Sequence, residues 1–116
     1  LRMSREDMLY SMGVMPSISS MIRCLTEVGD EILIQSPVYH VFYYVIEDNG
    51  RKVLENELIY ENGEYKIDFD DLDEKLSKVD LMILCNPHNP PRFHSCRIAV
   101  HSYHSSYLIP MHWSLG

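Results

Sequence analysis

The sequence predicts an α/β fold, a partial three-layer α/β/α sandwich built on a mostly parallel sheet. Short apolar runs recur along the chain, and helix-like segments separate them. Such alternation is typical of βαβ units, whose strands pair in parallel. Several strand-like runs, notably 31–35 and 80–85, are apolar at consecutive positions, as expected for a sheet that helices cover on both faces.

The first half of the chain predicts a helix, a strand and a second helix. Four apolar residues recur at helical spacing after Ser17, a residue suited to begin a helix. We expect Gly29 to end this helix at the C′ position. A strand over 31–35 follows, and the aromatic-rich segment 38–48 predicts the second helix.

The second half predicts a strand with mixed faces, a turn, a short extended piece, a helix and a final strand. These elements are expected over residues 52–58, 61–63, 65–67, 68–77 and 80–85. Asp68 or Asp70 is expected to cap the helix. Its first turn contains several acidic residues and its last turn contains lysine. This order is favourable because the N-terminus of the helix dipole is positive and the C-terminus is negative.

Composition excludes several classes of protein. The 116 residues allow one domain at most, and the net charge of −7 argues against a nucleic-acid surface, which needs clustered Lys and Arg. No apolar run approaches the roughly 20 residues of a membrane helix, and no signal peptide is indicated, so we expect no membrane partner and a cytoplasmic protein. The three cysteines show no CxxC spacing, and Cys24 and Cys85 are expected to be small core residues.

The composition changes abruptly near residue 91. All 17 acidic residues precede it, whereas 91–116 contain no Asp, Glu or Lys. We therefore expect a folded unit over 1–90 and a divergent tail over 91–116 that is aberrant or disordered. His101 and His104 could share a helix face and bind a metal, but their neighbours disfavour a helix, so we expect no metal site.

A loop of sequence Asn-Pro-His-Asn-Pro follows the last predicted strand, over residues 86–90. Each Asn precedes a Pro and is therefore biased toward an extended backbone, which limits the directions in which its amide can point. Ligands of open α/β sheets bind outside the carboxyl ends of the strands. The loop is thus a candidate binding element, although turn chemistry alone could account for it.

The chain resembles a known family over about residues 5–90. Motifs precede the loop at residues 13–18, 29–40, 49–52 and 61–72. In this order and at these spacings they resemble pyridoxal-phosphate-dependent enzymes of the class I/II aminotransferase superfamily. Within that superfamily they are most similar to the cystathionine β-lyase (cysteine-S-conjugate β-lyase) branch.

The resemblance implies that residues 1–90 form part of the large, cofactor-binding domain of a fold-type I enzyme with pyridoxal 5′-phosphate. It implies a sulfur-containing amino acid as substrate and a homodimer in full-length relatives. A C–S β-lyase acting on cystathionine or cysteine S-conjugates is the first hypothesis, and an amino-acid aminotransferase is the alternative. A non-catalytic α/β subunit that pairs with a full-length homologue is a third hypothesis.

The resemblance also assigns cofactor contacts. Gly13 and Val14 match the positions that grip the cofactor phosphate, although a Gly before a helix is by itself a weak phosphate signal. Tyr39 matches the aromatic residue that stacks on the pyridine ring, whereas its sequence context alone favours packing. Asn89 matches the residue that hydrogen-bonds to the phenolic oxygen of the cofactor.

No catalytic residue is expected in this chain. The family needs a Lys that binds the cofactor covalently and a carboxylate beside the pyridine nitrogen, and neither has a counterpart here. We therefore expect the chain to be inactive by itself. Asn86 is expected to hold the loop, and His88 to have a structural or surface role.

Overall fold

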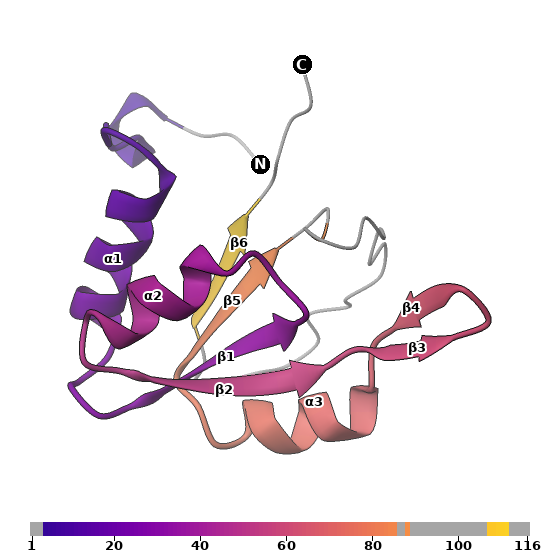
Figure 1. The fold of residues 1–116 in the computed structure, drawn as a ribbon. Helices are drawn as coiled ribbons and strands as arrows, with labels where there is room; N and C mark the ends of the chain where they lie inside the picture. The colour runs from indigo at the N-terminus through magenta and orange to yellow at the C-terminus, as the bar shows by residue number, and fades with distance from the viewer. Residues whose placement is uncertain (1–3, 86–87, 89–106, 112–116) are drawn as a thin grey trace.

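The computed structural model describes residues 4–85, 88 and 107–111. Within these residues a short 3₁₀ helix, η1 (Arg5–Asp7), precedes the helices and strands (Figure 1). They follow in the order α1 (Val14–Leu25), β1 (Glu31–Ser36), α2 (Val41–Glu47), β2 (Lys52–Glu57), β3 (Ile59–Glu61), β4 (Glu64–Lys66), α3 (Phe69–Leu76), β5 (Leu81–Cys85) and β6 (Tyr107–Met111).

The main sheet has the strand order β2-β1-β5-β6, and each adjacent pair is parallel. Ile32 of β1 lies in register with Val53 on one side and Leu81 on the other. The chain therefore leaves β1 through α2 to β2, and returns through α3 to the opposite side of β1. This arrangement confirms the predicted parallel α/β sheet.

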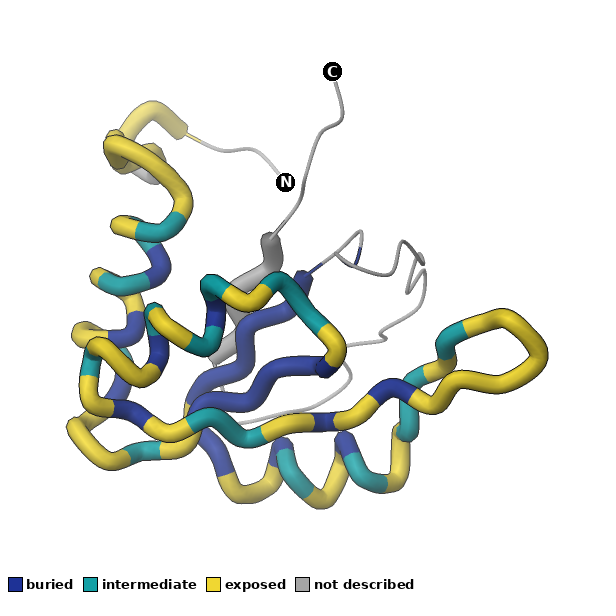
Figure 2. Tube along the Cα trace, in the orientation of Figure 1, coloured by how far each residue is buried: buried dark blue, intermediate teal, exposed yellow. Residues whose placement is uncertain are grey.

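Alternate residues of the central strands supply two separate cores. Ile32 and Ile34 point to the face that α1 and α2 cover, and Leu33 points to the face that α3 covers. The first core adds residues from both helices and from β5, namely Ile18, Ile22, Phe42, Ile46, Leu81, Ile83 and Cys85. The second consists of Leu33, Leu72, Leu76, Val79, Met82 and Leu84. Figure 2 shows β1 and β5 buried between the helix layers, which confirms the three-layer sandwich.

α1 begins earlier than predicted, at Val14, with Gly13 as its N-cap residue. Pro16 does not interrupt the first turn, because the N–H that proline lacks would have no partner inside the helix. The Ser17 N–H donates to the Gly13 carbonyl at 3.3 Å, which closes the first turn.

α1 also ends earlier than predicted. The backbone N–H and the hydroxyl of Thr26 both donate to the Ile22 carbonyl, at 3.1 and 2.6 Å, and Thr26 itself is extended. The prediction that Gly29 occupies the C′ position is therefore wrong. Gly29 lies in the turn before β1 at φ +96°, where its N–H donates to the Gly50 carbonyl at 2.9 Å.

Two further features depart from expectation. β3 and β4 form an antiparallel hairpin around Asn62 and Gly63, both at positive φ as a two-residue hairpin turn requires. A turn over 61–63 and an extended piece over 65–67 were predicted there, but the strand β3 that completes the hairpin was not. Cys24 is exposed on α1, so its predicted core role is wrong, whereas the burial predicted for Cys85 is confirmed.

β6 extends the sheet beyond β5, and the sequence did not indicate this strand. The rest of the tail, including His101 and His104, lies outside the described residues, so the expected boundary near residue 90 stays a prediction. Among the helices that are described, none is long and apolar enough to cross a membrane.

A polar network joins α3 to the sheet. The Asn56 side chain is fully buried; it accepts a hydrogen bond from Gln35 of β1 at 3.1 Å and donates to Asp71 of α3 at 2.7 Å. Asp71 also pairs with Lys75 at 2.7 Å. Asp68 caps α3 by accepting from the Asp71 N–H at 3.1 Å, as predicted.

Replacing Asp71 tests this network through its pH dependence. Hydrogen bonds from Lys75 and then Asn56 lower the pKa of the Asp71 carboxyl below its ordinary 3.8. A lowered pKa stabilises the folded state fully above the unfolded value, and that contribution is lost as the pH falls through the folded-state pKa. Urea unfolding should show Asp71→Asn to be less stable than wild type at about pH 7, with the difference disappearing near about pH 2.

Asp70→Asn, at the exposed neighbouring position, is the matched control for the Asp71 experiment. A stability difference for Asp71→Asn that is the same at both pH values would contradict the role of the carboxylate.

Candidate functional site

The candidate site lies at the carboxyl edge of the sheet. Because the four strands are parallel, their carboxyl ends share one edge. Short connections make α1 and α2 run back along the sheet, so the N-terminal ends of these helices face the same edge (Figure 1). In open α/β sheets this edge is where ligands bind.

The loop between β1 and α2 is held from both neighbouring strands. On the β2 side, the Leu58 N–H donates to the Ser36 carbonyl at 2.7 Å. On the β5 side, His88 Nε2 lies 2.8 Å from the Pro37 carbonyl oxygen. The segment Pro37–His40 is thereby anchored where it leaves the sheet.

We expected a structural or a surface role for His88, and its exposed fraction of 2% supports the structural one. Its contact with Pro37 spans 51 residues of sequence, and no local pattern indicated it. The one available signal was the position of this His in a proline-flanked loop after a buried strand, because a loop so restricted keeps its side chains close to the neighbouring strand ends.

Tyr39 is half-buried and packs against the core beneath α1 and α2. Its ring makes T-shaped contacts with two neighbours: Phe42, at a centroid distance of 6.0 Å and an interplanar angle of 84°, and His40, at 5.0 Å and 68°. The Phe42 N–H donates to the Tyr39 carbonyl at 3.0 Å as the loop turns into α2. The packing that the sequence favoured for Tyr39 is thus present, and it restricts the orientation of the ring.

Gly13 and Val14 form the start of α1 at the same edge. Within the described part of the chain, no side chain caps this helix start. The Gly13 carbonyl instead accepts from the hydroxyls of Ser11 and Ser17, at 3.0 and 2.9 Å. The N–H groups of Val14 and Met15, which have no partner within the helix, point in the direction from which an anion would bind, and the helix dipole also favours negative charge there.

The packing of this chain does not itself require glycine at position 13. Its φ of 164° is ordinary extended backbone. An added Cβ would meet Pro16 Cδ at 3.7 Å, an ordinary contact, with no closer described atom. Two physical reasons favour glycine there: glycine is a better N-cap residue than alanine, and it lets the backbone approach a ligand closely.

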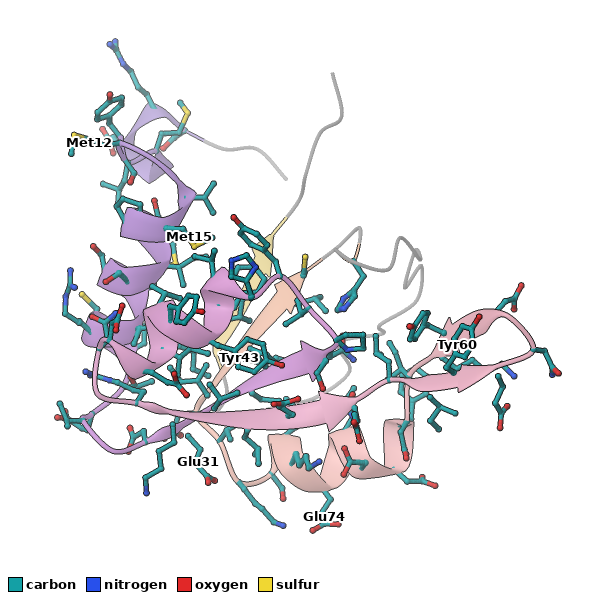
Figure 3. All side chains as sticks on the ribbon, viewed as in Figure 1. Met12, Met15, Glu31, Tyr43, Tyr60 and Glu74 are labelled. Atoms are coloured by element: carbon teal, nitrogen blue, oxygen red, sulfur yellow. The ribbon has the colours of Figure 1, made fainter. Side chains whose placement is uncertain are left out.

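Tyr43 of α2 packs against the core between this helix and the sheet, beside the site. Figure 3 shows its side chain pointing from α2 toward the strands. Burial of the hydroxyl, followed by the negative charge of Glu55 on β2, raises the pKa of Tyr43 above its ordinary 10.0.

All four lysines of the chain are described, and none lies in the segments 13–14 and 36–40. Lys52 begins β2 at the opposite edge of the sheet. The others pair with acidic residues, in the pairs Lys66–Glu61, Lys75–Asp71 and Lys78–Glu74. The expectation that the chain has no lysine placed for covalent cofactor binding stays a prediction.

Two of the predicted positions cannot be placed. Asn86 and Asn89 lie outside the described residues, so the proximity of Asn89 to Tyr39 stays a prediction. The structure brings Gly13, Val14 and Tyr39 to one edge of the sheet, and it fixes His88, the residue before Asn89, against the loop that carries Tyr39.

The chain belongs to the aminotransferase class I and II family, whose family model matches residues 1–91. This is a pyridoxal-phosphate-dependent family, as the resemblance in the motifs predicted. The chain is 46% identical over 91 residues to "Cystathionine beta-lyase PatB" of Bacillus subtilis, a match that covers 77% of this chain and 24% of that protein. It is 32% identical over 87 residues to "Protein MalY" of Escherichia coli, covering 73% and 22%.

Solved structures of pyridoxal-phosphate enzymes are also similar to this chain. The pyridoxal-phosphate-bound C–S lyase from Staphylococcus hominis superimposes with a TM-score of 0.72 at 30% identity, over 78% of this chain and 24% of that one. Cystalysin from Treponema denticola, which contains the same cofactor, gives 0.65 at 36% identity, over 67% and 20%. The chain therefore spans about a quarter of the length of these relatives.

The Gly13→Ala variant tests whether position 13 matters for folding. Alanine is a poorer N-cap residue than glycine, but it also reduces the entropy of the unfolded chain, and the two effects oppose each other at about 0.5–1 kcal/mol each. Urea unfolding should therefore show a change within about 1 kcal/mol. A larger loss would mean that the fold itself requires glycine there. Gly29→Ala is the contrasting variant, because its φ of +96° should make the loss larger.

Proposed function

We propose that this chain forms the cofactor-binding part of a pyridoxal-phosphate-dependent C–S β-lyase that acts on cystathionine or related cysteine S-conjugates. The observation that carries the proposal is the uncapped start of α1 at the same sheet edge as the oriented ring of Tyr39, in a chain 46% identical to a cystathionine β-lyase. A sulfur-containing amino acid is the substrate class we propose for the whole enzyme, and a homodimer is its proposed assembly.

The start of α1 would hold the phosphate of the cofactor. Phosphate binds well at helix N-termini, because backbone N–H groups and the helix dipole both favour negative charge. The residues fit this group: Gly13 has no side chain, and in the described residues no capping side chain competes for the first N–H groups. Val14 supplies the first helical N–H.

Tyr39 and Asn89 would hold the ring of the cofactor. The edge contacts from Phe42 and His40 restrict the Tyr39 ring before any ligand arrives, which limits the entropy lost on stacking. The Asn89 amide would donate to the phenolic oxygen and favour its anionic form. Pyridoxal 5′-phosphate supplies an electron sink for charge that develops at the α-carbon of an amino acid.

The chain would bind and orient the cofactor without completing the reaction. None of its four lysines lies in the loops of the site, and a Schiff-base lysine is essential to this chemistry. We therefore expect catalysis only when the remaining three quarters of a family enzyme are supplied.

A binding measurement tests the proposed ring contact. The probe is 4′-deoxypyridoxine 5′-phosphate, which has the ring and phosphate but no aldehyde to react with surface lysines. Loss of aromatic stacking in Tyr39→Ala should weaken binding by about 1 kcal/mol, or about fivefold in Kd, in equilibrium dialysis. Tyr60→Ala, which removes an exposed tyrosine from the hairpin, is the matched control. Equal Kd values for the two variants would contradict the stacking role.

A chimera tests the lyase assignment. Residues 1–90 would replace the matching segment of the Bacillus subtilis cystathionine β-lyase, which supplies the missing part of the enzyme. Because the two sequences are 46% identical, the core should remain compatible. We expect the chimera to release pyruvate from cystathionine. A chimera that binds the cofactor but exchanges amino groups with a keto acid, without releasing pyruvate, would favour an aminotransferase instead.

A further inference from the structure

The main sheet has an open edge along β2. Among the described residues, β2 pairs with β1 on one side and with no strand on the other (Figure 1). An unpaired edge can act as a template for a strand of another molecule, and proteins protect such edges with prolines, bulges or charged side chains. The segment Lys52–Glu57 contains no proline, and its register with β1 is continuous, so neither a proline nor a bulge protects it.

Two backbone hydrogen bonds show which groups of β2 face the open side. The Lys52 N–H donates to the Asp30 carbonyl at 2.8 Å, and the Leu58 N–H donates to the Ser36 carbonyl at 2.7 Å. Both bonds point toward β1 and its flanking residues. Along a strand, the N–H and C=O of one residue point to the same side, and successive residues alternate. The even-numbered residues of β2 therefore bond toward β1, whereas the N–H and C=O groups of residues 53, 55 and 57 face the open side.

Lys75 of α3 occupies the middle carbonyl of this open edge. Its Nζ donates to the Glu55 carbonyl oxygen at 2.6 Å, although the two residues are 20 positions apart in the sequence. The Asp71 carboxylate, one turn earlier on α3, holds the same ammonium group at 2.7 and 2.8 Å. The ammonium is thus fixed at the place where the N–H of an added strand would have to lie.

A second copy of β2 can match all three outward-facing residues of this edge. In an antiparallel arrangement about a two-fold axis at Glu55, Glu55 would lie opposite its own copy and Val53 opposite Glu57. Each such pair can exchange two N–H···O bonds. A contact of this isologous kind closes on itself and produces a dimer. Its central bonds need the Glu55 carbonyl of each copy, which is the group that Lys75 occupies.

We infer that Lys75 protects the open edge of β2 from pairing with β2 of a second copy. The inference does not rest on the proposed function, because the contact joins β2 to α3 and lies outside the segments 13–14 and 36–40. A merely structural role for Lys75 would be to hold α3 against the sheet. Loss of that role would lower the free energy of unfolding without changing the number of folded chains that associate.

Sedimentation equilibrium of the full chain tests this role. All variants carry Glu55→Gln, which removes the repulsion between two glutamates that would lie opposite each other. Adding Lys75→Met keeps most of the side chain but removes the donor, so the mass should rise about twofold, to that of a dimer. Adding Lys78→Met instead is the matched control: this lysine of the same segment pairs with Glu74, and the mass should not change.

A proline distinguishes edge pairing from non-specific association. Glu57→Pro, added to the Lys75→Met variant, removes an outward-facing N–H and leaves the bonds to β1 intact, because proline is tolerated on the open side of an edge strand. The mass should return to that of the Glu55→Gln chain. Glu57→Ala removes the same charge but keeps the N–H, so the mass should stay about twofold higher.

An unchanged mass after Lys75→Met would overturn the inference. Association that persists with the proline would also overturn it, because the contact would then lie elsewhere, as would association of the Lys78→Met control, because loss of charge would then be the cause. If the Lys75→Met variant does not fold, as judged by circular dichroism, Lys75→Gln replaces it, since its shorter amide is polar but does not reach the Glu55 carbonyl. The same masses are expected, and a Lys75→Gln variant with the mass of the Glu55→Gln chain would overturn the inference.

Discussion

The structure depends on the burial of β1 from both sides. This strand pairs with β2 and β5, and its consecutive apolar residues point alternately into the two cores. Ile32, Leu33 and Ile34 are all fully buried. A strand so enclosed fixes where its carboxyl end emerges, and the proposed site is built around that end. Any displacement of β1 would move Tyr39, the start of α2 and the Pro37 contact together.

Polar side chains fix how the helices sit on this strand. Arg51 is buried and its guanidinium donates to the Thr26 hydroxyl and carbonyl, at 3.0 and 2.6 Å, where α1 ends. A cation at a helix C-terminus is favourable because the last carbonyls carry partial negative charge. Asn49 continues the link, accepting from Ser19 and Arg23 of α1 at 3.2 and 3.0 Å. These contacts hold α1 beside α2, and therefore hold the start of α1 at the carboxyl edge.

At the carboxyl edge of the sheet, two groups are held in fixed directions before any ligand binds. The start of α1 offers backbone N–H groups, whose direction the helix fixes, and the β1–α2 loop offers an aromatic ring in T-shaped contact with Phe42 and His40. A ligand with a phosphate at one end and a flat ring at the other suits such a pair, because little conformational freedom is left to lose. The four lysines lie away from these two segments, three of them in ion pairs with acidic residues and Lys52 at the amino-terminal edge of the sheet.

Local patterns in the sequence determined the parallel α/β fold, the strands predicted over 31–35 and 80–85, the Asp68 cap and the family. Each of these depends on residue spacing within a few turns or on short motifs. Only the tertiary structure decided where α1 starts and ends, that Gly29 serves a turn, that Cys24 is exposed and that β6 joins the sheet. It alone decided the bond between His88 and Pro37, 51 residues apart. The physical reason is that distant segments compete for the same hydrogen-bonding groups and the same buried surface. The spacing of residues along one segment does not show which of these segments will pair or pack with it.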